Sequence, residues 1–216
     1  MALTFLKGSR DGVFYFGRVF CGGIVRLMRW DIAVDHERLS AFRPCVFVSN
    51  HQSIMDVLVF GSVVPRRTVA VGKKELTKIP LFGWFFRASG NLVIQRGSSE
   101  DARNMLEAAA RRLEEEKLSV WFMPEGHRNA GRELLAFKTG AFRLAAAARV
   151  PVVPVVAAPL EAIVDTRRWL SRPARLPISV LDPVSAAEAV GEEQIAALAA
   201  RVREAMQREL DRLAGA

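Results

Sequence analysis

Short apolar runs alternate with longer amphipathic stretches along most of the chain. Compact apolar runs bounded by glycine, proline or polar residues are typical of buried strands, whereas apolar positions three or four residues apart indicate helices. Strands are predicted in this way at residues 30–34, 45–48, 68–71, 92–94, 118–123, 152–156 and 178–181. Helices are predicted between them at residues 56–64, 98–117, 139–149 and 186–213, with residues 73–87 helical or looping. The alternation predicts an α/β fold in which helices flank a largely parallel sheet.

Polar residues follow three of the predicted strands directly. His51, Arg96 and Glu125 each come after an apolar strand. In a parallel sheet the loops at the carboxyl ends of the strands gather at one edge, where functional residues collect. We therefore expect these three side chains to converge at one edge of the sheet.

His51 and Asp56 belong to the run Val-Ser-Asn-His-Gln-Ser-Ile-Met-Asp at residues 48–56. A carboxylate that holds one imidazole nitrogen leaves the other free to take a proton from an alcohol. Five residues of continuous helix turn through about 140°, so the pair requires His51 in a loop that enters a helix. Ser49 or Asn50 would then lie near the N-cap, with Asp56 in the first turns. The alternative interpretation is a helix cap with an incidental histidine.

Three further segments accompany this run. They read Gly-Asn-Leu-Val-Ile-Gln-Arg at residues 90–96, Trp-Phe-Met-Pro-Glu-Gly-His-Arg-Asn at residues 121–129 and Val-Pro-Val-Val-Pro-Val at residues 150–155. In this order, and with the His/Asp run, they resemble the four sequence blocks of the bacterial 1-acylglycerol-3-phosphate (lysophosphatidic acid) acyltransferase family. The resemblance covers about residues 45 to 160, and residues 72–76, 79–83 and 137–142 are similar to its connecting segments.

The third block departs from the family at two positions. His127 stands where the family usually has threonine, and Asn129 where it usually has serine. Both replacements are polar, so they do not indicate loss of activity. They bear on the detailed contacts with the acceptor, the lyso-lipid that receives the acyl group in this family.

The resemblance implies a glycerolphosphate acyltransferase-like fold and a set of site residues. His51 is implied as the general base and Asp56 as its partner. The implied substrate-binding residues are Lys73, Arg96, Glu125, Gly126 and Arg128. An arginine fork suits a phosphomonoester because it can bind two oxygens at once.

Some of these roles have alternatives. Glu125 is assigned to orienting Arg128 or the polar atoms of the acceptor, and the alternative is a structural Arg–Glu pair that holds the turn. Lys73 resembles a family lysine near the reacting carbonyl or phosphate, although alone it would be read as a solvated surface lysine. Ser53 lies close enough in sequence to suggest a Ser-His-Asp nucleophile, but the resemblance points to direct attack by the substrate hydroxyl.

The activity implied by the resemblance is transfer of a fatty acyl group to the 2-hydroxyl of 1-acylglycerol 3-phosphate. The donor would be acyl-acyl carrier protein (acyl-ACP) or acyl-coenzyme A (acyl-CoA), a co-substrate rather than a cofactor, and the product phosphatidic acid for phospholipid biosynthesis. The blocks describe the reaction better than the acceptor headgroup. The alternative is therefore an acyltransferase that acts on another lyso-lipid, such as a lyso-ornithine lipid or a lysophospholipid.

Two other classes of protein are weighed against an acyltransferase. A metallohydrolase would use His51, Asp56, Glu125 and His127 as ligands, but the sequence lacks a paired-histidine spacing such as H-E-x-x-H, and we expect no metal site. A basic membrane-surface adaptor would use only the N-terminal segment. That interpretation leaves the His/Asp and Glu/Arg constellation without a purpose.

The charge balance indicates anionic partners. Among 216 residues, 31 Lys and Arg outnumber 23 Asp and Glu, which gives a net charge of +8. Such an excess attracts nucleic acid, an acidic membrane face or phosphorylated substrates. Nucleic acid is not expected, because no Cys/His spacing resembles a zinc knuckle and aromatic residues are not interleaved with a dense basic stretch. Cys21 and Cys45, too few for a disulfide framework, are expected to be reduced thiols in packed or lipid-facing positions.

The N-terminal segment is apolar and aromatic but interrupted by charge. Arg18 and Arg26 fall within residues 13–29, where charge is costly in a membrane span, and the pattern does not fit a signal peptide. The mixture predicts an amphipathic helix that lies in the membrane interface, with a helix packed on the domain core as the alternative. We therefore divide the chain into a membrane-binding segment at residues 1–34 and an acyltransferase domain at residues 35–216. The protein would lie at the cytoplasmic face of the bacterial inner membrane, peripheral or monotopic.

Overall fold

The computed structural model describes most of the chain. It covers residues 11–80, 82–94, 99–130, 133–161, 163–165, 168 and 170–215, with the backbone alone at residues 82 and 99–102. Arg96 and residues 1–10 of the predicted N-terminal segment lie outside this set.

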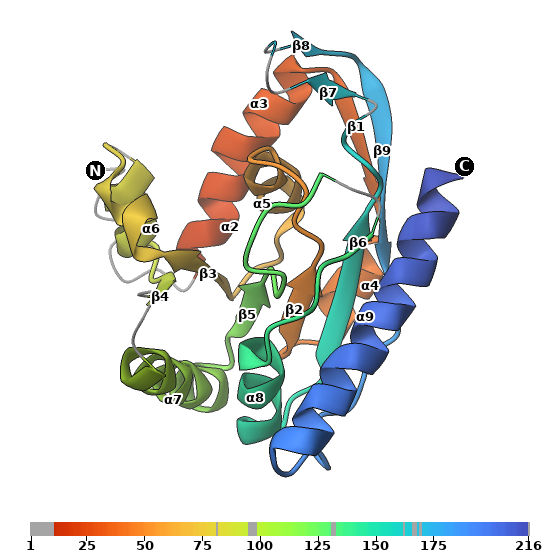
Figure 1. Ribbon diagram of the computed structural model, residues 1–216. Coiled ribbons are helices and arrows are strands. Elements are labelled where there is room, and N and C mark those ends of the chain that lie inside the picture. Colours follow the sequence, from red (N-terminus) through yellow and green to blue (C-terminus); the bar gives the residue numbers. More distant parts are fainter. Residues whose placement is uncertain are drawn as a thin grey trace.

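A seven-stranded sheet forms the centre of the described structure (Figure 1). Its order is β1-β9-β6-β2-β5-β3-β4, and the strands pair in parallel except where β6 meets β9. The strands are β1 (Trp30–Val34), β2 (Val46–Ser49), β3 (Thr68–Lys73), β4 (Leu92–Ile94), β5 (Ser119–Phe122), β6 (Val152–Ala157) and β9 (Ala174–Val180). The largely parallel sheet predicted from the alternating pattern is confirmed.

Helices cover both faces of the sheet, and the central strands are therefore buried. The helical elements are α2 (Gly12–Phe16), the π-helical η1 (Gly17–Cys21), α3 (Gly22–Leu27), α4 (His36–Ala41), α5 (Asp56–Val63), the 3₁₀ turn η2 (Lys74–Lys78), α6 (Phe82–Ala88), α7 (Ser99–Glu116), α8 (Gly140–Ala147) and α9 (Glu192–Ala214). In Figure 1, α2, α3 and α5 lie on one side of the sheet, and α7, α8 and α9 lie on the other. Every residue of β2, β5 and β6 is buried, which explains their nearly continuous apolar runs.

Some elements differ from the sequence prediction at their ends. Residues 36–41, which lie between two predicted strands and were not assigned to a helix, form α4, because the Asp35 carboxylate accepts a hydrogen bond from the Arg38 amide at 2.8 Å and caps the helix. Strand β9 begins at Ala174, before the predicted start, because it pairs with β1 from that residue onward. Helix α9 begins at Glu192, after the predicted start. A short hairpin of β7 (Val164–Asp165) and β8 (Leu170–Ser171) was not predicted.

The N-terminal helical segment packs closely on α5. A Cβ atom at Gly17 would lie 2.0 Å from the Gly61 carbonyl oxygen, and one at Gly61 would lie 2.7 Å from the Cys21 sulfur. These contacts require glycine at both positions. Gly12, Gly17, Cys21 and Val25 form the buried side of the segment. The alternative of a helix packed on the core is thus correct for one side of this segment.

The same segment leads directly into the sheet. Residues 30–34, placed in the N-terminal segment from the sequence, form β1 and pair with β9. The sheet therefore begins before the predicted boundary at residue 34. Within the described ranges, none of the helices combines the length and apolar character needed to span a bilayer.

Both cysteines are buried free thiols. Burial raises the pKa of the Cys21 and Cys45 thiols to about 12. Of the two predicted environments, packed or lipid-facing, the structure places both cysteines in packed positions.

Candidate active site

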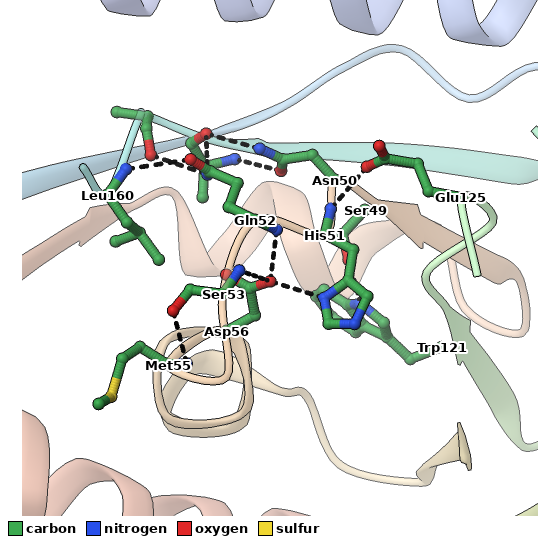
Figure 2. Close-up of polar contacts among 12 residues, drawn as sticks. Ser49, Asn50, His51, Gln52, Ser53, Met55, Asp56, Trp121, Glu125 and Leu160 are labelled. Atoms are coloured by element: carbon green, nitrogen blue, oxygen red, sulfur yellow. Dashed lines mark hydrogen bonds and ion pairs between the residues drawn. The ribbon is translucent and has the colours of Figure 1, made fainter. Parts of the chain in front are cut away.

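His51 lies in the loop that joins β2 to α5, and its ring is held by Asp56 (Figure 2). The imidazole Nδ1 is 2.7 Å from Asp56 Oδ2. The same oxygen accepts hydrogen bonds from the Gln52 amide at 2.7 Å and the Ser53 amide at 2.9 Å. An ionised carboxylate only accepts hydrogen bonds, so it selects the tautomer with the proton on Nδ1. The Nε2 lone pair is then available to an incoming hydroxyl.

The start of α5 supports this arrangement. Asp56 is the first residue of the helix and is completely buried, so its negative charge lies at the positive end of the helix dipole. Met55, rather than Ser49 or Asn50, occupies the N-cap position. The prediction that Ser49 or Asn50 lies near the N-cap is wrong. The loop amides before the helix, those of Gln52 and Ser53, bind the Asp56 carboxylate instead.

Two amide side chains fasten the His51 loop to the end of β6. Asn50 pairs with the Ala157 backbone, donating to its carbonyl and accepting from its amide at 3.0 Å each. Gln52 donates to the Ala158 carbonyl at 3.0 Å and accepts from the Leu160 amide at 3.0 Å. From the sequence, Asn50 was named only as an N-cap candidate and Gln52 was not singled out. The sequence feature that pointed to this role was the presence of two amide side chains on either side of His51, directly after a buried strand.

Ser53 makes contacts within the loop. Its hydroxyl oxygen accepts a hydrogen bond from the Met55 amide at 3.2 Å, and its own amide donates to Asp56. In the described structure no hydrogen bond joins Ser53 to the His51 ring. The geometry therefore favours the reading without a serine nucleophile.

Glu125 follows β5 and holds the backbone at His51. The residue is 3% exposed, and its carboxylate accepts two hydrogen bonds: Oε1 from the His51 amide at 2.8 Å and Oε2 from the Leu135 amide at 3.0 Å. The Asn129 backbone amide donates to the His51 carbonyl at 2.7 Å, so both backbone groups of His51 are hydrogen-bonded to the segment that follows β5. Burial raises the pKa of the Glu125 carboxyl above its ordinary value, and the two amide hydrogen bonds oppose this shift. Glu125 is thus placed to position the loop that carries His51.

The expected pairing of Glu125 with Arg128 is not formed among the described residues. Both Glu125 oxygens bind backbone amides, and the Arg128 side chain lies exposed on the same turn. No acidic side chain in the described ranges forms an ion pair with Arg128. Its guanidinium is therefore accessible to an anionic ligand.

Gly126 adopts a left-handed backbone conformation, with φ of +69°. A Cβ atom there would also lie 2.7 Å from Lys138 Nζ and 2.8 Å from its Cε. Glycine at this position therefore satisfies a backbone requirement and leaves room for a neighbouring lysine.

Lys73 ends β3 and lies beside the last residue of β4. Their parallel register pairs Lys73 with Ile94, two positions before Arg96. Lys73 is half-buried rather than a fully solvated lysine. The structure thus brings His51, Glu125 and Lys73 to the carboxyl ends of neighbouring parallel strands. The predicted convergence is confirmed for His51 and Glu125, while Arg96 lies outside the described residues.

In the described ranges, no group of three or more His, Cys, Asp or Glu side chains is arranged to hold a metal ion. What the described site offers is an oriented imidazole, a carboxylate partner and exposed cations. These groups suit proton removal from a hydroxyl that attacks an already activated acyl group.

The structure thus places a histidine–carboxylate pair at the edge of a largely parallel α/β sheet. The family model described as Acyltransferase matches residues 31–158, more than half of the chain. The chain therefore belongs to the acyltransferase family. The resemblance noted in the sequence is confirmed.

Individual relatives narrow the likeness further. The chain is 38% identical over 153 residues to a 1-acyl-sn-glycerol-3-phosphate acyltransferase from Haemophilus influenzae, covering 71% of this chain and 62% of the relative. It is 33% identical over 168 residues to the Escherichia coli protein of the same name, covering 78% of this chain and 67% of that protein. The chain thus spans less than two thirds of the Haemophilus relative.

The fold is also shared with a solved structure. A crystal structure of a 1-acyl-sn-glycerophosphate acyltransferase from Thermotoga maritima superposes with a TM-score of 0.75 at 24% sequence identity. The match covers 93% of this chain and 79% of that one. This likeness supports the fold assignment.

Proposed function

We propose that the protein transfers a fatty acyl group from acyl-ACP or acyl-CoA to the 2-hydroxyl of 1-acylglycerol 3-phosphate, forming phosphatidic acid. The observation that carries this proposal is the His51–Asp56 pair, with Nδ1 and Oδ2 2.7 Å apart, in a chain of the acyltransferase family. Relatives that are named 1-acyl-sn-glycerol-3-phosphate acyltransferases support the choice of acceptor.

The reaction requires no nucleophile from the protein. His51 Nε2 takes the proton of the 2-hydroxyl while the hydroxyl oxygen attacks the thioester carbonyl carbon. The resulting tetrahedral oxyanion collapses, the carbon–sulfur bond breaks, and the leaving thiolate takes the proton back from the imidazolium. Asp56 stabilises the imidazolium that exists between these steps.

The acceptor phosphate is assigned to cations around the same sheet edge. Arg128 is exposed and lacks an acidic partner in the described ranges, which leaves its fork available to two phosphate oxygens. Lys73 and Arg96 remain proposed members of the substrate site, with Gly126 shaping the turn between Glu125 and Arg128. Glu125 is assigned to the loop rather than to the lipid, because its oxygens hold the amides of His51 and Leu135.

A headgroup comparison tests the choice of acceptor. Purified protein should acylate 1-acylglycerol 3-phosphate faster than lyso-lipids that share its acyl chain but carry a phosphodiester, an ornithine or no headgroup. The reason is that a phosphomonoester offers a dianion to the cations of the site. Initial rates at saturating donor, measured with each acceptor in turn, provide the comparison. A preference for lyso-ornithine lipid or a lysophospholipid would replace the proposed acceptor with the alternative.

We also propose that the protein attaches peripherally to the cytoplasmic face of the bacterial inner membrane through the N-terminal helical segment. The outward side of this segment carries the exposed large apolar side chains Tyr15, Val19, Phe20 and Leu27. Arg18, Arg26 and Arg29 line an open pocket of about 670 Å³ beside them. Apolar and cationic side chains on one surface suit burial at the acyl boundary together with attraction to anionic headgroups.

A surface substitution tests this attachment without removing elements that the fold needs. Changing Val19, Phe20 and Leu27 together to serine should lower binding to anionic vesicles at least about tenfold, because each buried apolar side chain contributes about 1.5–3 kcal/mol. Cosedimentation measures the binding. Val190 is 76% exposed on the segment that precedes α9, so Val190→Ser serves as the matched control. Unchanged binding of the triple variant would limit this segment to its packing role against α5.

A further inference from the structure

Lys138 lies against the turn that carries Glu125, Gly126 and Arg128, although it follows them in a separate segment. Its backbone amide donates to the Pro124 carbonyl at 2.9 Å, which fixes the segment beside the turn. The end of its side chain then crosses Gly126: a Cβ atom there would be 2.7 Å from Nζ, 2.8 Å from Cε and 3.1 Å from Cδ. The ammonium therefore lies close to the backbone of the turn.

No carboxylate among the described side chains explains this position. Lys138 forms no ion pair with an acidic side chain in the described part of the chain, and both oxygens of neighbouring Glu125 are bound to amides. Its side chain is exposed, so the ammonium is accessible to a ligand. A lysine that lies along the backbone without an anionic partner places a positive charge on this turn.

Arg128 adds a second cation to the same turn. It is also exposed and lacks an acidic partner within the described ranges. The turn is in direct contact with the base, because Glu125 and Asn129 hold the amide and carbonyl of His51. Two cations that have no acidic partner in the described ranges, beside His51, suit an anion with several oxygens attached near the reacting hydroxyl.

We propose that Lys138 binds the acceptor's phosphate together with Arg128, and that Gly126 lacks a side chain so that the ammonium can reach this position. The inference deepens the proposed function and rests on it. Lysine acts here as a point charge, while arginine supplies the directional fork. The pattern Phe-Lys-Thr-Gly at residues 137–140 therefore contributes to substrate binding as well as to the start of α8.

Kinetics of Lys138 variants test the inference. Lys138→Met should raise the KM for 1-acylglycerol 3-phosphate roughly tenfold to a hundredfold, with kcat changed much less, because a charge-assisted contact is lost. Lys138→Arg should restore most of the affinity. Lys117 is exposed just before β5, at the opposite edge of the sheet, so Lys117→Met is the matched control and should leave both constants unchanged. An unchanged acceptor KM in Lys138→Met would overturn the inference.

A double-mutant cycle tests the link with Gly126. Gly126→Ala should raise the acceptor KM in the normal chain, since the new methyl group displaces the ammonium. In the Lys138→Ala background the same change should raise it far less. Equal effects of Gly126→Ala in both backgrounds would show that the glycine serves the backbone alone.

A labelling experiment separates this inference from the proposed function. Reaction of Lys138 with an amine-acylating reagent, followed by peptide mass spectrometry, should be slowed by 1-acylglycerol 3-phosphate and not by the matching monoacylglycerol. Labelling of Lys117 should respond to neither lipid. Failure of the normal protein to make phosphatidic acid would refute the proposed function, whereas absence of protection at Lys138 would refute the phosphate contact.

Discussion

Replacing His51 with alanine should lower acyl transfer by about 10²–10⁴-fold, the range expected for loss of a general base. The fold should be preserved, because His51 is held through its backbone by Glu125 and Asn129 and these contacts do not need the imidazole. Steady-state rates at saturating donor and acceptor measure the loss, and thermal unfolding checks the fold. His36 is an exposed histidine on α4, and His36→Ala should retain full activity. Near-normal turnover in His51→Ala would exclude His51 as the base.

Asp56→Asn should reduce turnover about a hundredfold or more while leaving the donor and acceptor KM values little changed. An asparagine oxygen can still accept from the Gln52 and Ser53 amides, but the uncharged group no longer stabilises the imidazolium. In the flipped orientation the NH₂ group would instead face Nδ1, which selects the wrong tautomer and leaves the two loop amides without an acceptor, because all three contacts use the same Asp56 oxygen. Asp56 acts on the reaction through the His51 ring, so the double variant should be scarcely worse than His51→Ala alone.

Glu125→Ala should damage both the fold and the chemistry. The change leaves the partly buried amides of His51 and Leu135 without their acceptor, which costs about 1–3 kcal/mol in the free energy of unfolding. His51 then loses one of the two hydrogen bonds that hold its backbone, so kcat should fall at least tenfold at 25 °C, where the variant is still folded. Denaturant unfolding and steady-state kinetics measure the two effects.

The control for this variant is a glutamate with a different role. Glu107 lies exposed on α7 and pairs with Arg103 at 3.6 Å, so Glu107→Ala should leave stability and turnover nearly unchanged. Glu125→Gln keeps one accepting oxygen but turns an NH₂ group toward the other amide, and should lie between alanine and the normal residue. If Glu125→Ala instead raised only the acceptor KM, the original assignment to the lipid or to Arg128 would be correct.

The parts of the fold that sequence predicts best are those with the strongest local patterns. Strands β2, β5 and β6 were found because burial on both faces leaves almost no polar position in them. Helix α4 was missed because six residues are too few for a clear helical period. Its one local signal was Asp35, whose side chain caps the helix.

The site shows the same division between local and distant information. The His51–Asp56 pair was predictable because its members lie five residues apart in a loop followed by a helix. The partners of Glu125 could not be predicted from sequence, because His51 lies 74 residues away and both hydrogen bonds go to backbone amides that carry no residue-specific signal. Lys138 became informative only when its side chain was found to lie over Gly126.

The central claim is that this chain makes phosphatidic acid with His51 as the base, and product analysis tests it most directly. Purified protein would be incubated with an isotopically labelled acyl thioester and 1-acylglycerol 3-phosphate, and the products identified by mass spectrometry with the position of the new acyl group assigned. We expect labelled phosphatidic acid carrying the new chain at the 2-position with the normal protein, and almost none with His51→Ala. Absence of this product from folded normal protein with both acyl-ACP and acyl-CoA, or equal amounts from His51→Ala, would contradict the claim.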